Sequence, residues 1–412
     1  MTMNHDVLST SPAPTSDVHV IGGGLGGLAA AALIARAGRT VTVHEARGRL
    51  GGRGTTDRKD GFRLNQGPHA LFRAGEADRV LRSLGIAPSG QAPNLRGAMM
   101  ADGERVGLSP GGPLSLLRSP MLGGRDKFEL ASVLAGINRV DSSGLASVSA
   151  REWVEQVSSR DRVREILHTV IRLATYTNLP DELSAEIAVM QVQLALGKGV
   201  IYLDRGWEQL VEALAQFPGV RHLRHDHVGE LPDAPCVIVA TGSPQAAANL
   251  MGVQFDAGPC AEVSVLDVGL ARPPRHGFVL GIDPPIYLSN HGFPEGMTPQ
   301  GASLVSVAEY LPADADPDRN RLESFLTHAG IDAGAIVTER YLHRMPAVSA
   351  IATAEAGGLR GRPQSGASVR PGVFLVGDWV GSRGHLLDAV LASAQDAAFG
   401  AISYLERRPA MR

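Results

Sequence analysis

The chain has 412 residues, of which 44% are hydrophobic and 20% charged, with a formal net charge of −3. This length exceeds one hydrophobic core and indicates two domains, while the near-neutral charge gives no support for a nucleic-acid partner. Residues 1–16 have neither the basic nor the apolar region of a signal peptide, so we expect a short disordered tail. No apolar run approaches the ~20 residues of a membrane span. Cys236 and Cys260 have no metal-binding or redox spacing, so we expect a cytoplasmic protein without a metal site.

The first predicted elements form a strand–helix–strand unit. Residues 18–21 are a short β-branched run, which is typical of a buried strand. An alanine-rich segment over residues 25–37 predicts a helix, and RTVTVHE at residues 39–45 predicts a second strand. Residues 22–27 between the first strand and the helix read G-x-G-x-x-G. The order of these elements is that of a dinucleotide-binding βαβ unit.

Each glycine of this motif has a separate physical reason. Gly22 permits the tight turn, Gly24 lets a pyrophosphate approach the backbone, and Gly27 lets the helix pack closely on the sheet. The helix N-terminus adds unpaired N–H groups and a partial positive charge. Glu45, at the end of the second strand, is placed to accept hydrogen bonds from ribose hydroxyls. A lone G-x-G-x-x-G often occurs by chance, but all the surrounding elements agree here, so we predict dinucleotide binding.

Two arginines follow directly in ARGRLGGRGTT at residues 46–56. Arg49 and Arg53 surround the pair Gly51–Gly52, and a guanidinium can bridge two phosphate oxygens with fixed geometry. A solvated basic loop is the alternative interpretation of this stretch.

With this element, the sequence resembles the superfamily of flavin-containing amine oxidases, protoporphyrinogen oxidases and phytoene desaturases, which carry a similar E-A-x-x-R-x-G-G-R stretch. Further segments support the resemblance: DGFRLNQGPHALF at 60–72, GVIYLDRGWEQLVEALAQF at 199–217, APCVIVATG at 234–242 and GVFLVGDWVGSRGHLLDAVLASAQDAA at 372–398. The resemblance is dense at both ends of the chain and thin between about residues 90 and 195. It implies FAD as cofactor. No cysteine lies near residues 377–389, so we expect the FAD to be bound noncovalently.

The resemblance also implies which residues contact FAD. Glu45 would hold the adenosine ribose, Arg49 and Arg53 the phosphates, and the backbone of Val228 would meet the adenine. Asp378 would face the ribityl and phosphate region, and the helix beginning near Leu387 would direct its positive end at the flavin. The full set of expected contacts is Gly22, Gly24, Leu25, Gly26, Gly27, Glu45, Ala46, Arg49, Gly52, Arg53, Gly67, Pro68, His69, Val228, Gly377, Asp378, Leu387, Asp388 and Ala389.

The expected fold class is α/β, with a discontinuous Rossmann-like FAD-binding domain and an α+β substrate domain of mixed sheet and helices. Residues 17–90, 195–245 and 345–412 would form the FAD-binding domain, and residues 91–194 and 246–344 the substrate domain. Segments 128–140 and 149–177 have the periodicity of amphipathic helices, and 261–311 has the alternation of several strands. Residues 113–124 are apolar and loop-like, so they are either a structural loop or the mouth of the substrate site. The stretch between Val228 and Ala240 is too short for the extra sheet that the family usually has there.

Candidate catalytic residues are few and individually weak. His69 follows the Gly-Pro turn that is expected against the flavin, and His385 follows a glycine of the C-terminal motif. Tyr287 and His291 lie on the predicted substrate sheet or in the loop after it, and Glu309 lies on a later strand. Each of the five is also explicable as a buried structural residue.

The chemistry that we expect is hydride removal by FAD from a largely apolar small molecule, with O2 or a quinone as electron acceptor. Residues 255–345 contain no lysine, which disfavours the usual amine oxidase arrangement. The turn Pro299-Gln300-Gly301 and the stretch GGLRGRP at residues 357–363 instead resemble the phytoene desaturase and protoporphyrinogen oxidase branch, and this resemblance favours carbon–carbon desaturation. Alternatives are an amine oxidase without that lysine, a flavin-dependent polyene isomerase and a non-enzymatic lipid escort. A transient contact with a membrane surface and the oligomeric state stay open.

Overall fold

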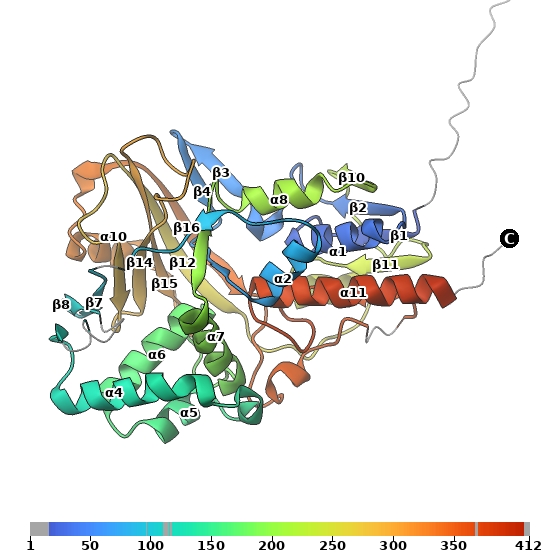
Figure 1. The fold of residues 1–412 in the computed structure, drawn as a ribbon. Helices are drawn as coiled ribbons and strands as arrows, with labels where there is room; N and C mark the ends of the chain where they lie inside the picture. The colour runs from blue at the N-terminus through green and yellow to red at the C-terminus, as the bar shows by residue number, and fades with distance from the viewer. Residues whose placement is uncertain (1–15, 96, 110–114, 116–117, 367–369, 408–412) are drawn as a thin grey trace, which may run out of the picture.

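The computed structural model describes residues 16–407, apart from 96, 110–114, 116–117 and 367–369. The expected tail therefore lies almost wholly outside the described residues, as does part of the predicted loop at 113–124. In Figure 1 a parallel sheet with two long helices occupies one side of the molecule, and a larger sheet with a group of helices beneath it occupies the other. Among the described residues, no helix is long and apolar enough to cross a membrane.

A five-stranded parallel sheet collects strands from distant parts of the chain. Its order is β10-β2-β1-β11-β17. The strands are β1 (Val18–Ile21), β2 (Val41–Glu45), β10 (Val220–Arg224), β11 (Cys236–Val239) and β17 (Val373–Leu375). The predicted βαβ unit is thus present, and β10, β11 and β17 join it from later in the chain. No strand lies between β10 and β11, as the short stretch there predicted.

Two helices cover one face of this sheet. They are α1 (Leu25–Arg36), as predicted, and α11 (Leu387–Arg407), which lie side by side. Contact is close because Gly26 has no side chain: a Cβ there would lie 2.7 Å from Val376 and 2.8 Å from Val390. The alanines of both helices are buried in the core beneath them. The N-terminal and C-terminal motifs therefore meet across one helix pair.

A seven-stranded mixed sheet forms the second layer, in the order β16-β12-β15-β14-β13-β7-β8. Only β13 and β7 pair in parallel. The four predicted strands over 261–311 are all present, and β16 adds a long edge strand that the sequence analysis did not identify. The strands are β7 (Met99–Asp102), β8 (Arg105–Leu108), β12 (Ala261–Leu270), β13 (Phe278–Gly281), β14 (Ile286–Asn290), β15 (Ser303–Tyr310) and β16 (Ile336–Val348).

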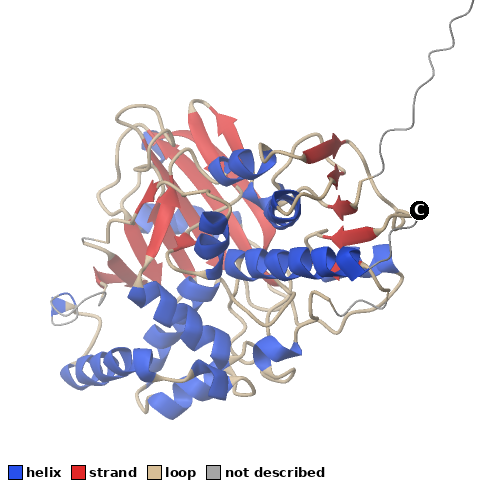
Figure 2. Ribbon diagram, turned by 45° about the vertical axis from the view of Figure 1, so that its right-hand side comes forward, coloured by secondary structure: helices blue, strands red, loops and turns tan. Residues whose placement is uncertain are grey.

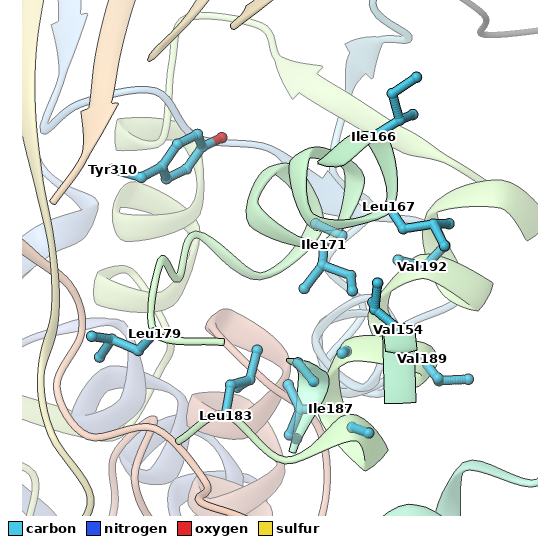
Figure 3. Close-up of a cluster of buried hydrophobic side chains, with 14 of the residues drawn as sticks. Val154, Ile166, Leu167, Ile171, Leu179, Leu183, Ile187, Val189, Val192 and Tyr310 are labelled. Carbon is cyan, nitrogen blue, oxygen red and sulfur yellow. The ribbon is translucent and has the colours of Figure 1, made fainter. Parts of the chain in front are cut away.

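Helices cover both faces of this sheet. On one face, α10 (Arg319–His328) closes a small core with Leu322, Phe325 and Leu326. On the other, a larger core joins the sheet to a helical group, and Figure 3 shows Tyr310 of β15 extending toward the helices that carry Ile171 and Val189. The group consists of α4 (Gly124–Gly136), α5 (Ala150–Val157), α6 (Asp161–Thr175) and α7 (Ala185–Gly197).

The predicted amphipathic segments at 128–140 and 149–177 form α4, α5 and α6. Ser149 begins α5 with a capping box, in which its side chain accepts from Glu152 N and the Glu152 side chain accepts from Ser149 N. Such reciprocal caps pair two backbone donors that the helix itself leaves free.

Short elements connect the two layers, as Figure 2 shows from a second direction. A hairpin and a three-stranded sheet, in the order β5-β9-β6, lie between them. These elements are β3 (Thr56–Lys59), β4 (Phe62–Asn65), β5 (Leu71–Phe72), α2 (Glu76–Ser83), β6 (Gly90–Gln91), β9 (Val200–Leu203), α8 (Glu208–Ala215) and α9 (Pro244–Met251). The mixed α/β architecture confirms the expected fold class, whereas the division into two domains with the given boundaries stays a prediction.

Candidate functional site

The turn between β1 and α1 requires glycine at two positions. Gly22 has φ +110°, and a Cβ there would lie 2.3 Å from the carbonyl oxygen of Ala240. A Cβ on Gly27 would lie 2.0 Å from the carbonyl oxygen of Gly22. Both contacts are with backbone, which cannot move aside without disturbing the sheet. These glycines therefore bring β1, β11 and α1 together, as the motif predicted.

Gly24 is different, because a Cβ there would meet no atom within 4 Å. It is the N-cap residue of α1, with φ −73° and ψ 175°, a conformation that any residue adopts. The fold itself therefore gives no reason for glycine at this position. Open space here, in front of the N–H groups of Leu25, Gly26 and Gly27, suits an anionic group approaching the helix N-terminus.

Glu45 ends β2 beside this loop and is 9% exposed. Its Oε2 accepts from Gly23 N at 2.9 Å, and its Oε1 accepts from Arg47 N at 2.8 Å. Each carboxylate oxygen keeps a second lone pair for a ribose hydroxyl. Ala46 follows it at the surface, and Val228 is partly buried on the segment that starts with Asp226, whose N–H donates to the Glu45 carbonyl.

The two terminal motifs are joined by an ion pair between Arg53 and Asp378, with Nη1 and Oδ2 2.9 Å apart. The Asp378 side chain is 1% exposed. Burial by itself would raise the pKa of Asp378, but the Arg53 charge and hydrogen bonds from Arg53 and Ser349 outweigh it and lower that pKa. Asp378 is therefore ionised at neutral pH.

Arg49 does not face Arg53. Its guanidinium lies 2.6 Å from Asp57 Oδ1 and is half exposed, on the surface near Thr55. Gly52, with φ +54°, lies against Gly24: a Cβ there would be 3.3 Å from the Gly24 Cα. In this arrangement only Arg53 of the two expected phosphate ligands reaches the C-terminal motif.

The start of α11 is fixed by its neighbours. Gly377 N donates to the Ser393 hydroxyl at 3.2 Å, which ties the end of β17 to the helix. The N–H groups of Asp388 and Ala389 are directed at the His385 carbonyl, at 3.1 and 3.4 Å. Leu387 is the first helical residue.

The Asp388 side chain does not face this turn but caps α2. Its Oδ1 accepts from Ala77 N at 2.7 Å, and a Cβ on Gly75 would touch the carboxylate. Burial, together with the smaller effect of the nearby Glu76 charge, raises the pKa of Asp388 to about 7, although the hydrogen bond from Ala77 N opposes the rise.

Asp388 should make stability depend on pH. A carboxyl whose pKa is raised on folding favours the folded state when protonated, so this contribution is lost as pH rises from about 4 to about 7. Asp388→Asn keeps the acceptor for Ala77 N–H but cannot ionise. Urea unfolding at pH 5, 6, 7 and 8 should show a smaller decline for the variant than for the wild type, and parallel declines would contradict this assignment.

The Gly-Pro turn at Gly67–Pro68 is buried and lies against β12 and β16. A Cβ on Gly67, where φ is +80°, would lie 2.7 Å from Met345 and 3.6 Å from Val265. His69 follows, with Nδ1 2.8 Å from the Gly67 carbonyl and its ring against Trp207. Burial lowers the pKa of His69 to about 4, partly countered by the Gly67 hydrogen bond. His69 is thus neutral, with Nδ1–H donating to Gly67 and Nε2 free to accept.

His385 is also buried and neutral. Its Nε2 lies 2.8 Å from the carbonyl oxygen of Thr175 at the end of α6, so Nε2–H is the donor. Burial, followed by the charge of Arg362, lowers the pKa of His385 to about 4. Its Nδ1 has no hydrogen-bond partner among the described residues.

Tyr287 lies in a buried group of aromatic side chains between β14, β15 and α6. Its hydroxyl is 2.7 Å from that of Tyr176, and its ring stacks on Tyr310 with centroids 5.5 Å apart. His291 stacks on Tyr202 at 4.0 Å, and burial lowers the pKa of His291 to about 3. The structure therefore joins Tyr287 to two further tyrosines, Tyr176 and Tyr310, which the sequence did not single out.

Glu309 lies apart from this group. Its Oε1 is 2.9 Å from Arg321 Nε of α10, on the far face of the sheet. Burial raises the pKa of Glu309, although the hydrogen bond and charge of Arg321 oppose the rise. Nothing in these contacts connects Glu309 with the other candidates.

Several buried polar atoms around the C-terminal motif lack a partner within the described part of the chain. They are Thr241 Oγ1, Arg362 Nε and Nη2, Asp378 Oδ1, Trp379 Nε1 and His385 Nδ1. Buried polar groups of proteins are nearly always hydrogen-bonded, so this concentration is typical of a site that receives a polar ligand. Together with the open space at Gly24, it fits an FAD that extends from the glycine loop to the start of α11. Arg362 lies in the stretch GGLRGRP at residues 357–363 but is not among the expected site residues.

Comparison with known proteins agrees with this geometry. The profile of the family described as flavin-containing amine oxidoreductase matches residues 25–231, half of the chain. The chain belongs to this family. The resemblance given by the sequence motifs is thereby confirmed, and FAD is the family's cofactor.

The individual relatives that match this chain share limited identity with it. A Mycobacterium tuberculosis protein named as a flavin-containing monoamine oxidase is 27% identical over 324 residues, which are 73% of this chain and 66% of that protein. A phytoene desaturase of Cercospora nicotianae is 43% identical over 79 residues, covering 19% of this chain and 12% of that enzyme. The crystal structure of an oxidoreductase from Methanosarcina mazei superposes with a TM-score of 0.68 at 20% identity, over 95% of this chain and all of that one. The chain thus spans slightly less than two thirds of the first relative, and the structural likeness is one of fold.

Proposed function

We propose that the protein is an FAD-dependent oxidoreductase that removes a hydride from a largely apolar organic substrate, with carbon–carbon desaturation favoured. The observation that carries the proposal is the Arg53–Asp378 ion pair. It joins the N-terminal glycine loop to the C-terminal Gly-Asp motif at a separation of 2.9 Å. A cofactor in which a pyrophosphate joins an adenosine to a ribityl flavin is the ligand that such a pair of motifs would hold.

Support for an apolar substrate comes from the side chains next to the Gly-Pro turn. Val265 and Met345 are the residues closest to Gly67, and residues 255–345 contain no lysine. The two candidate histidines, His69 and His385, are neutral at pH 7 because burial depresses their pKa values. Neutral imidazoles and the apolar side chains at Gly67 favour a substrate without a charge of its own.

The bound FAD would supply the hydride acceptor. The protein would then orient the substrate, exclude water and move one proton. His69 Nε2 and His385 Nδ1 are the acceptor atoms that these residues leave free, since the other nitrogen of each ring donates to a backbone carbonyl. The Tyr287 hydroxyl is hydrogen-bonded to the Tyr176 hydroxyl, so Tyr287 would act on the substrate only as part of this pair.

An amine is the second candidate substrate. It is favoured by the extent of the match to the monoamine oxidase relative, which covers 73% of this chain, against 19% for the phytoene desaturase. A tyrosine group such as Tyr176, Tyr287 and Tyr310 could also hold a cation over its rings.

A flavin-dependent isomerase and a lipid escort without catalysis are the further alternatives. We also retain the proposed domain division, O2 or a quinone as electron acceptor, and a cytoplasmic location.

These readings predict different spectra. The purified protein should be yellow. When its substrate is added without oxygen, the absorption of the oxidised flavin should disappear almost completely. Candidate polyenes, porphyrinogens and amines would be added separately under argon, and the absorption recorded. Bleaching by amines alone would overturn the desaturation proposal, turnover that needs prior reduction of the flavin would indicate isomerisation, and a colourless protein that does not bind added FAD would contradict an FAD enzyme.

A further inference from the structure

Arg362 is a buried arginine without an ion-pair partner in the described part of the structure. It follows the short helical turn Gly358–Gly361, and its residue is 6% exposed. Nη1 donates to the carbonyl oxygen of Gly384 at 2.9 Å, whereas Nε and Nη2 have no partner. Leaving an arginine buried with two unused donors is costly, so its position calls for a function.

The position of this charge relates it to the FAD site. Gly384, which accepts its hydrogen bond, stands three residues before α11 begins at Leu387. The Arg362 charge also acts on Asp378 and on His385, both of which have an unpartnered buried atom. Positive potential from Arg362 and from the N-terminus of α11 is thus directed to the same region of the fold.

We propose that Arg362 is a positioning residue of the FAD site, which supplies an unshared positive charge behind the Gly384–His385 turn. This inference rests on the proposed FAD-binding function. The charge has two consequences: it favours the more negative, reduced form of the cofactor, and it adds to the burial that keeps His385 neutral, so that Nδ1 stays an acceptor.

Other charged groups face these residues and must be considered. Glu186 at the start of α7 and Asp378 lie near enough to Arg362 to stabilise its charge, although burial still lowers the pKa of Arg362 to about 10. His385 meets the Arg362 charge, the Asp378 charge and the Thr175 carbonyl, and Asp388 packs against Gly384. Asp378 is already paired with Arg53, and the Glu186 carboxylate accepts from Leu359 N and forms no ion pair with Arg362, so Arg362 is a cation without an ion-pair partner among the described residues beside His385.

The test compares Arg362→Gln, which removes the charge, with Arg362→Lys, which keeps it. Circular dichroism and the flavin spectrum first establish folding and FAD content, and the reduction potential is then measured by equilibration with reference dyes. Arg362→Gln should shift the two-electron reduction equilibrium toward the oxidised flavin at least tenfold, which corresponds to about 30 mV. Arg362→Lys, which keeps the charge, should have a reduction potential close to that of the wild type. A shift of less than twofold in Arg362→Gln would overturn the proposal.

A second measurement does not need the cofactor. NMR titration of His385 in the FAD-free protein should show a higher pKa in Arg362→Gln than in the wild type, with Arg362→Lys close to the wild type. An unchanged His385 titration would contradict the proposal even if the Gln variant retains no FAD. A wild-type protein that binds no FAD would instead overturn the proposed function, while the His385 titration would still decide the role of Arg362.

Discussion

Replacing Gly24 with alanine is expected to weaken FAD binding by roughly 100-fold, or about 2.7 kcal/mol, without unfolding the protein. The Cβ would enter space that no protein atom occupies within 4 Å, and the backbone at φ −73° accepts any residue. Stability of the FAD-free protein should therefore stay within about 1 kcal/mol of the wild type, the usual range for an N-cap change. A methyl group there would keep the pyrophosphate from the helix N-terminus and lengthen its charge-assisted hydrogen bonds.

Gly27→Ala is the matched control, three residues further along, in the first turn of α1. Its Cβ would lie 2.0 Å from the Gly22 carbonyl oxygen, so it should destabilise the fold itself, by about 3 kcal/mol or more. FAD titration by fluorescence and urea unfolding of both FAD-free variants distinguish the two effects. If Gly24→Ala bound FAD as tightly as the wild type, the pyrophosphate could not lie against this residue.

Arg53→Met should reduce both stability and FAD affinity. It leaves Asp378, 1% exposed, without its cation, and breaking a buried pair typically costs about 3–5 kcal/mol. Because the Arg53 side chain is 36% exposed, we expect the lower end, about 3 kcal/mol. FAD affinity should fall by roughly 1.5–3 kcal/mol, as for loss of a charged hydrogen bond. Urea unfolding and FAD titration measure the two quantities.

The pH dependence of this loss has a definite sign. Arg53 lowers the pKa of Asp378 in the folded state, so the stabilisation is present above pH 4 and is lost as pH falls through the folded pKa. The difference between wild type and Arg53→Met should therefore shrink in acid. Adding Asp378→Asn to the variant should recover part of the loss. Arg49→Met, which breaks a half-exposed pair with Asp57, should cost less than about 1 kcal/mol, and an equal cost for both arginines would contradict this account.

The βαβ unit and the C-terminal helix could be predicted because their signals are local. Glycine spacing, a β-branched run and an alanine-rich helix specify β1, α1 and β2 without reference to the rest of the chain. The strands over 261–311 could be predicted for the same reason, since their buried and half-buried residues are contiguous in the sequence.

β16 could not be predicted in this way, because its side chains interact with residues that are distant in the sequence. Arg340 stands in the middle of the strand, where a polar outward residue would be expected, yet it pairs with Asp57 of β3 and Asp267 of β12. The alternation of buried and exposed residues along β16 is therefore irregular. The strand also crosses the domain boundary expected at residue 345.

The direction of individual side chains could not be predicted from the sequence either. Asp388 was expected at the flavin through its backbone, but its carboxylate caps α2, more than 300 residues earlier in the chain. Arg362 lies in the family-like stretch GGLRGRP at residues 357–363, but only the packing of this segment against Gly384 reveals a buried charge without an ion-pair partner among the described residues. Motif spacing predicts which backbone segments meet, whereas ion pairs and caps depend on the tertiary fold.

The central claim is that one FAD lies between the glycine loop and the start of α11. Crystals of the protein purified with FAD would test it most directly. We predict electron density for the pyrophosphate within hydrogen-bond distance of the Gly24–Gly26 backbone and Arg53, with the ribityl chain at Asp378 and the flavin beside residues 387–389. Density that places the flavin away from α11, or the pyrophosphate away from the Gly24–Gly26 backbone, would contradict the account.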